Sequence, residues 1–383
     1  MEQVRKKADI KKVKNQTREK DNQREKNKRQ SKEEFAGLYI FVGIDVHKKS
    51  WHVTIYVEDV LYKSYSMSPP SSKQLISYLK DNFPGGEFYL VYEAGFSGYG
   101  LYDDAKEAGM ECIVVSPADV PMSNKNKKFK TDSHDSKNLA KQYKSGLLEG
   151  IYVPDAELRE YRALVRLRNK LVKDRTRIKN YTKSNLMFFG KEILEEDGDN
   201  ITSWSRKYFH LLSELQYRTD TGSKVIERLK DTTQYYNEQI IRVDKEILEL
   251  SKHPRFAEDV KILRSVPGIS TLTAMVILVE IGDFSRFEDT HKLKSYVGLI
   301  PEEHSSGETE IKSGITKRGN KFLKRVIIEA SWVAIRKDKT LLKKYTKATK
   351  RMRGSKAIIL VAGSLLSRIR SIMRQRVLYR VAV

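Results

Sequence analysis

The chain has 383 residues, and its 73 lysines and arginines exceed its 50 aspartates and glutamates by 23, which predicts a polyanionic partner. The one cysteine, Cys112, excludes a disulfide framework and a cysteine-based zinc site, and the seven histidines show no ligand spacing. No apolar run approaches the roughly 18 residues of a membrane span, and the charged N-terminus lacks the apolar segment of a signal peptide, so we expect a cytoplasmic protein. Charge alone does not separate a nucleic-acid interface from a solvated surface.

Residues 1–37 are rich in charge and nearly free of apolar side chains, so they cannot bury a core. We expect a basic flexible arm there, with order beginning at Leu38. Three β-rich runs joined by short polar connections come next, which predicts an antiparallel meander. The runs are Tyr39–Asp45, Trp51–Val57 and Leu61–Met67.

Further elements complete a first domain at residues 38–153. We expect a helix capped near Ser71–Ser72, a strand ending at Glu93, a helix over Gly98–Ala108, a strand over Glu111–Val115 and a helix from Asp132. Three strands, helix, strand, helix, strand, helix is the order of a ribonuclease H-like α/β fold. Such a fold brings carboxylates from the first strand, the fourth strand and a late helix to one edge of the sheet.

Four carboxylates occupy those places. Asp45 and Glu93 each end an apolar run, and Asp132 and Asp135 are three residues apart on one helix face. Carboxylate oxygens are the ligands that hard divalent cations prefer, so the set predicts a Mg²⁺ (or Mn²⁺) site for phosphoryl transfer. Each acid also has a purely structural explanation: Asp132 as a helix cap, Asp135 as a partner of the helix dipole, and the other two as strand ends.

A basic loop precedes the late helix. Its lysines are suited to neutralising phosphates beside the predicted site, although a mobile surface loop explains any one of them equally well. They are Lys125, Lys127, Lys128 and Lys130.

Residues 154–260 have the pattern of long helices with dense basic faces. Apolar residues three and four apart form a heptad seam, which predicts an antiparallel helical arm or an oligomerising coiled coil. The seam comprises Leu229, Tyr236, Ile240, Val243, Ile247 and Leu250.

Residues 261–383 form a third, mostly helical domain. The turn at Gly268, before a helix over Thr271–Ile281, resembles half of a helix-hairpin-helix whose backbone N–H groups bind a phosphate. We expect a loop over Glu302–Gly307, then a basic helix over Phe322–Arg336 and a final helix over Ala357–Met373. Further nucleic-acid contacts are expected from Lys317, Arg318 and Lys321.

The expected loop contains Ser305 and Ser306 directly before Gly307. A serine hydroxyl is a poor nucleophile until a base or a metal activates it. His304 is adjacent in sequence, but adjacency does not establish a catalytic geometry. The residues alone therefore leave the role of these serines open.

From Leu38 to about Met373 the chain resembles the transposases of insertion-sequence family 110, especially its 1111 branch. The resemblance to its RuvC-like Asp-Glu-Asp-Asp nuclease domain is carried by three blocks: Gly43–Lys48, Tyr92–Tyr102 and Lys130–Ser136. The resemblance to its second transposase domain is carried by four: Val266–Ile269, Tyr296–Pro301, His304–Gly307 and Gly314–Asn320.

This resemblance implies that Asp45, Glu93, Asp132 and Asp135 hold the metal and that Ser306 is the nucleophile, with Ser305 as the fallback. It also implies a homotetramer, assembled from dimers, in which the serine of one subunit completes the carboxylate site of another. The implied partners are donor and target DNA and a structured guide non-coding RNA from the element, in the nucleoid-associated cytoplasm of a bacterium or archaeon.

We therefore interpret the chain as a magnesium-dependent DNA transposase that cuts and rejoins strands through a phosphoserine intermediate. Two other classes remain open. One is a hydrolytic RuvC-like Holliday-junction nuclease that uses metal-activated water, and the other is a non-catalytic nucleic-acid-binding protein. A covalent protein–DNA adduct separates the first class from a recombinase, and metal-dependent strand cleavage separates the second.

Overall fold

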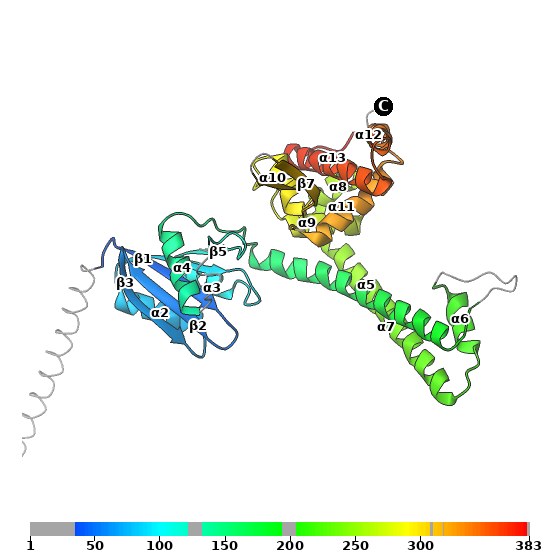
Figure 1. The fold of residues 1–383 in the computed structure, drawn as a ribbon, viewed down its shortest axis with the longest axis horizontal. Coiled ribbons are helices and arrows are strands. Elements are labelled where there is room, and N and C mark those ends of the chain that lie inside the picture. The colour runs from blue at the N-terminus through cyan, green and yellow to red at the C-terminus, as the bar shows by residue number, and fades with distance from the viewer. Residues whose placement is uncertain (1–34, 122–131, 194–203, 307–308, 317, 381–383) are drawn as a thin grey trace, which may run out of the picture. The chain divides into compact units, whose positions relative to one another are not determined.

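The computed structural model describes residues 35–121, 132–193, 204–306, 309–316 and 318–380, without the side chains of residues 302–315 (Figure 1). The predicted N-terminal arm, the four lysines of the basic loop and Lys317 therefore lie outside the described residues, apart from residues 35–37 of the arm. The chain divides into two compact units, the first ending at Val153 and the second beginning at Pro154. None of the helices that the structure describes is long and apolar enough to cross a membrane.

The first unit is built on a five-stranded mixed sheet of order β3-β2-β1-β4-β5. Strands β1, β2 and β3 pair antiparallel, which confirms the predicted meander, and β4 and β5 run parallel to β1. The strands are β1 (Tyr39–Val46), β2 (Trp51–Val57), β3 (Val60–Met67), β4 (Glu87–Glu93) and β5 (Glu111–Val115).

Helices cover both faces of this sheet (Figure 1). They are α2 (Ser72–Asn82), α3 (Gly100–Glu107) and α4 (Asp132–Lys144). Helices α2 and α3 pack on one face through a core that includes Leu75, Leu79 and Leu101. Helix α4 packs on the opposite face, where Leu139 joins Val91 of β4 in a separate apolar cluster. The α/β character predicted for this part of the chain is confirmed.

Helix α4 lies unusually close to the sheet at Gly43 of β1. A β-carbon added at Gly43 would lie 2.0 Å from the carbonyl oxygen of Ser136 and 2.5 Å from the backbone nitrogen of Ala140. The buried hydroxyls of Thr54 and Ser136 share a hydrogen bond of 2.8 Å across the same interface. Thr54 is also the β2 residue paired with Gly43. A glycine and a buried hydroxyl pair thus fix where α4 docks.

We expect Gly43→Ala to lower the free energy of unfolding of the first unit by about 1–3 kcal/mol, because the added methyl group forces α4 away from the sheet. Urea denaturation followed by circular dichroism measures the change. Gly100→Ala is the matched control, since a β-carbon at Gly100 meets nothing within 4 Å. Equal stability of the two variants would contradict the close docking of α4.

The second unit is mostly helical, as predicted, with one hairpin. Its helices are α5 (Ala156–Phe188), α6 (Arg206–Glu214), α7 (Asp220–Leu250), α8 (Ala257–Arg264), α9 (Thr271–Ile281), α10 (Thr290–Val297), α11 (Lys321–Ala334), α12 (Lys339–Thr349) and α13 (Gly354–Gln375). Its strands are β6 (Pro301–Ser306) and β7 (Thr309–Ile315), which pair antiparallel.

Helices α5 and α7 form an antiparallel pair. Arg168 contacts Asp244 at 2.5 Å and Arg175 contacts Asn237 at 2.9 Å, so the contacts move backward along α7 as they advance along α5. Three residues of the predicted heptad seam are buried, Ile240, Val243 and Ile247, and the other three, Leu229, Tyr236 and Leu250, are partly buried. The buried face of α7 also includes Ile226 and Thr233, which the prediction did not name. The hydroxyl of Thr233 at this seam donates to the Leu229 carbonyl, which satisfies it within the helix.

Helix α9 carries a buried carboxylate in an otherwise apolar core. Glu280 is fully buried and receives two hydrogen bonds from Arg166 of α5, of 2.7 and 2.8 Å. Asn320, which caps the start of α11, donates to the same carboxylate at 2.7 Å, and the Tyr296 hydroxyl of α10 donates to the Glu280 carbonyl. One acid therefore joins four helices at the base of the β6–β7 hairpin.

Removing Arg166 leaves the buried Glu280 carboxylate with fewer hydrogen-bond donors. Because Asn320 remains, we expect Arg166→Ala to lower the free energy of unfolding of the second unit by about 2 kcal/mol. The control is Arg177→Ala, whose exposed ion pair with Asp174 within α5 contributes less than about 0.5 kcal/mol. A melting temperature unchanged by Arg166→Ala would show that the network does not hold the unit together.

The predicted loop over Glu302–Gly307 is wrong over most of its length, because residues 302–306 belong to strand β6. The prediction rested on polar composition and a glycine, whereas pairing with β7 satisfies the backbone of this polar segment. Ser306 pairs with Thr309 at one end of this ladder. The serines thus lie at the end of a hairpin strand.

Candidate metal centre

The positions of two of the four predicted carboxylates follow from the register of the strands that carry them. Strands β1 and β4 are parallel, and Ile44 pairs with Tyr92, so Asp45 and Glu93 come next on neighbouring strands at the same edge of the sheet. Side chains alternate between the faces of a strand. Asp45 therefore shares the face of Gly43, on which α4 packs.

The same alternation places Glu93 on the face of Val91, which packs against Leu139 of α4. Helix α4 begins at Asp132, so its N-terminal turn carries the other two predicted carboxylates. Asp132 is exposed, whereas Asp135 is partly buried one turn later. The docking of α4 on Gly43 thereby brings acids from three elements to one face and one edge of the sheet.

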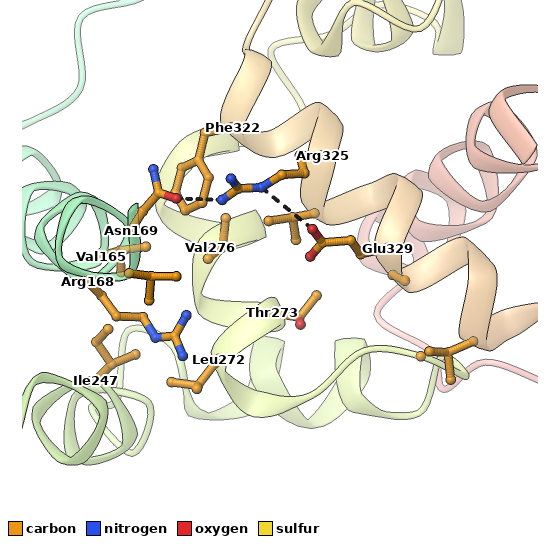
Figure 2. Close-up of a pocket in the computed structure, with 15 residues that line it drawn as sticks. Val165, Arg168, Asn169, Ile247, Leu272, Thr273, Val276, Phe322, Arg325 and Glu329 are labelled. Carbon is orange, nitrogen blue, oxygen red and sulfur yellow. Dashed lines mark hydrogen bonds and ion pairs between the residues drawn. The ribbon is translucent and has the colours of Figure 1, made fainter. Parts of the chain in front are cut away.

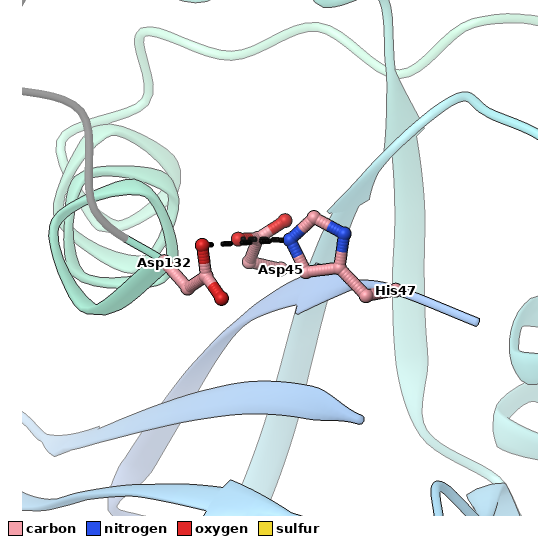
Figure 3. Close-up of side chains that lie close together, drawn as sticks. All are labelled: Asp45, His47 and Asp132. Carbon is pink, nitrogen blue, oxygen red and sulfur yellow. Dashed lines mark ion pairs between the residues drawn. The ribbon is translucent and has the colours of Figure 1, made fainter. Parts of the chain in front are cut away.

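A histidine contacts two of these acids (Figure 3). His47 Nε2 is 3.2 Å from Asp45 Oδ2 and 3.5 Å from Asp132 Oδ1. Asp45, His47 and Asp132 each place one ligand atom within 4.8 Å of the others. Glu93 and Asp135 do not belong to this group.

Sequence reasoning missed His47 because the spacing of the histidines was compared only with one another. The available signal was its distance of two residues from Asp45, since alternate residues of an extended chain point to the same side. His47 follows the last residue of β1, Val46.

Burial raises the pKa of Asp45 above its ordinary value, and the negative charges of Asp132 and Asp135 raise it further, while His47 lowers it. A carboxylate that is partly desolvated beside two other acids is stabilised in its charged form by a nearby cation. With oxygen and nitrogen donors this close together, the residues fit a divalent metal ion. Asp45 and Asp132 are the two carboxylates best placed to hold one.

We expect Asp45→Asn and Asp132→Asn each to weaken Mn²⁺ binding at least about tenfold, because each removes one anionic ligand from the group. Isothermal titration calorimetry measures the affinity. Asp81→Asn, which removes an acid of α2 outside the group, is the control and should leave binding unchanged. Mn²⁺ binding that survives both site variants would exclude this metal centre.

The remaining predicted site residues lie in the second unit. Arg318 lies just before α11 and Lys321 is its first residue, and both are exposed. The structure does not test the phosphate contacts predicted for them. Ser306 ends β6, and its side chain lies outside the described residues, as does that of Ser305. These roles remain predictions.

Gly268 has a packing role that the sequence did not reveal. Its φ is +89°, and a β-carbon there would lie 2.4 Å from the Ala330 carbonyl oxygen of α11. It lines a cavity of about 230 Å³ between α5, α9 and α11, which Figure 2 shows with Arg325 between Asn169 and Glu329. Close packing on α11 explains why this position is a glycine, and its predicted phosphate contact stays a prediction.

Two family models match the chain. A DEDD transposase model of the IS110 family matches residues 42–189, and the model of the IS116/IS110/IS902 transposase family matches residues 260–347. The chain belongs to the IS110 family of transposases. The two matches include all four predicted carboxylates and the segment with Ser306.

Individual transposases support this membership. The transposase for insertion sequence element IS1111A of Coxiella burnetii is 27% identical over 66% of this chain and 67% of its own. The transposase for insertion sequence element IS1533 of Leptospira borgpetersenii is 28% identical over 65% of this chain and 72% of its own. Among solved structures, the large terminase nuclease of thermophilic phage G20c matches 44% of this chain and 74% of that one at 11% identity, but its TM-score of 0.19 supports no statement about the fold.

Proposed function

We propose that this IS110-family transposase cuts and rejoins DNA through a phosphoserine intermediate, at a site that Asp45, Glu93, Asp132 and Asp135 supply with a divalent cation. The observation that carries the proposal is the meeting of Asp45 from β1 with Asp132 from the start of α4. The strand order β3-β2-β1-β4-β5, with a helix delivering acids to the edge of β1 and β4, supports a ribonuclease H-like fold. The described part of the chain thus provides the carboxylate half of the chemistry.

A bound Mg²⁺ or Mn²⁺ supplies Lewis acidity toward the scissile phosphate. The protein supplies the geometry: β1 and α4 are held together at Gly43, so their acids stay close without an induced rearrangement. His47 lies within hydrogen-bonding distance of Asp45 and orients that carboxylate. Such preorganised groups lower the barrier to phosphoryl transfer.

Ser306 is the proposed nucleophile. Its Oγ forms a bond to the phosphorus as the bond from phosphorus to one deoxyribose oxygen breaks, and the serine proton leaves with the departing strand or with water. The phosphodiester energy stays in the phosphoserine link, and attack by a hydroxyl of a second strand reverses the step. The family match over residues 260–347, which contains Ser306, supports this assignment.

The same proposal includes the wider assembly. The carboxylates and Ser306 belong to different compact units, so the reaction requires both units to act at one phosphate. A tetramer in which subunits exchange serines, with a guide RNA that selects donor and target DNA, meets this requirement. The division into an arm, a nuclease domain, a helical arm and a C-terminal domain is part of the proposal.

A hydrolytic nuclease is the second candidate. It is favoured by the placement of Asp45, His47 and Asp132 within one unit, since metal-activated water needs no residue from the other. The cleaved strand distinguishes the two activities, because a recombinase leaves it attached to Ser306 and a hydrolytic nuclease releases it.

We expect Asp45→Ala and Asp132→Ala to abolish strand cleavage in magnesium while DNA binding persists, because each removes a metal ligand but no cationic side chain. Cleavage of labelled element ends on denaturing gels, alongside gel-shift binding, measures both properties. Cleavage that continues in either variant would exclude the proposed metal chemistry.

We expect the wild-type protein to become covalently attached to DNA at Ser306, detected by mass spectrometry of the digested adduct. Ser306→Ala should lose the adduct and strand exchange, and Ser305→Ala is the adjacent control that should retain both. Normal cleavage by Ser306→Ala, without an adduct, would favour the hydrolytic nuclease.

A further inference from the structure

A dense run of positive charge in the described second unit extends from the residues before α12 to the start of α13. Residues 336–356 contain ten lysines and arginines, all exposed, and a single acid. That acid, Asp338, is buried, caps α12 and pairs with Arg368 at 2.7 Å. It therefore offers no countercharge to the exposed cations.

Helix α12 presents three of these cations as a straight stripe. Leu341 and Ala348 are the buried residues of α12, and Lys339, Lys343 and Lys347 follow one another at four-residue spacing on the opposite, exposed side. Four residues rise about 6 Å along a helix, so each lysine reaches a separate point of an extended anion. We call Lys339, Lys343 and Lys347 the α12 stripe.

Helix stability does not explain the stripe. Like charges four residues apart destabilise a helix, and a positive charge in the first turn, such as that of Lys339, opposes the helix dipole. None of the stripe lysines forms an ion pair with any carboxylate that the structure describes.

Three lysines elsewhere in the unit each pair with an acid within one turn. Lys224 pairs with Asp220, and Lys252 pairs with Glu249. Lys292 likewise pairs with a carboxylate four residues before it. The α12 stripe departs from this pattern.

Lys294 of α10 lies near another lysine of α12, Lys344. Burial lowers the pKa of Lys294 below its ordinary value, and the positive charge of Lys344 lowers it further. Lys344 follows directly after Lys343 of the stripe.

We propose that the α12 stripe holds double-stranded DNA through its phosphates, without reading its sequence. Lysine is a point charge suited to phosphate, and α12 contains no arginine, asparagine or glutamine, whose forked or amide groups pair bidentately with guanine and adenine. The partner is DNA because the family to which the chain belongs transposes DNA. The inference rests on the proposed function and adds a binding surface to it.

The test compares two triple variants with the same charge loss. Lys339→Gln/Lys343→Gln/Lys347→Gln removes the stripe, and Lys224→Gln/Lys252→Gln/Lys292→Gln removes lysines that already have acidic partners. Fluorescence anisotropy measures the affinity of the full chain for two duplex DNAs of unrelated sequence and for a structured RNA of equal length, over a range of salt. All titrations contain EDTA, so the result does not depend on the proposed metal chemistry. Thermal melting checks that both variants fold.

We expect the stripe variant to lose at least about tenfold in affinity for both duplexes, with a salt slope lower by about 2 to 3, as the loss of three phosphate contacts requires. The control variant should bind like the wild type. Equal losses in both variants would overturn the proposal, as would an unchanged salt slope. A loss confined to the RNA, or to one of the two duplexes, would also overturn it, because the surface would then bind a different partner or read sequence.

Discussion

The close approach of α4 to Gly43 is the constraint on which the proposed chemistry depends. An aspartate near the end of a strand and another at the start of a helix do not form a site unless the distance between them is fixed. The absence of a β-carbon at Gly43 allows the backbone at Ser136 and Ala140 to contact β1, and the buried Thr54–Ser136 hydrogen bond fixes the position along the sheet. With α4 docked there, its first turn reaches the end of β1, where Asp45 lies.

Much of this arrangement could be predicted from the sequence, because it follows from local patterns. Apolar runs ending in Asp45 and Glu93 indicated two strand ends, and parallel pairing with Ile44 opposite Tyr92 places those ends together. The heptad spacing on α7 likewise predicted a buried seam. In each case the periodicity of the element decides which side chains are buried, so the sequence carries the information.

Other features depend on contacts between distant segments, which local patterns do not encode. The polar composition of residues 302–306 suggested a loop, but pairing with β7 makes it a strand. The turn at Gly268 resembled a phosphate-binding motif, yet its glycine is required by the carbonyl of Ala330, 62 positions later. His47 and the α12 stripe were missed for a different reason: their spacing is visible in the sequence, but the structure was needed to show that His47 contacts Asp45 and Asp132 and that the stripe lies opposite the buried side of α12.

The central claim is that docking of α4 on β1 creates a divalent-cation site. Anomalous X-ray diffraction from crystals grown with Mn²⁺ tests it most directly, since the metal itself is located. The account predicts an anomalous peak within coordination distance of Asp45 and Asp132 in the wild type, and none there in Gly43→Val, in which the larger side chain displaces α4. Wild-type crystals with saturating Mn²⁺ and no peak between these two carboxylates would contradict it.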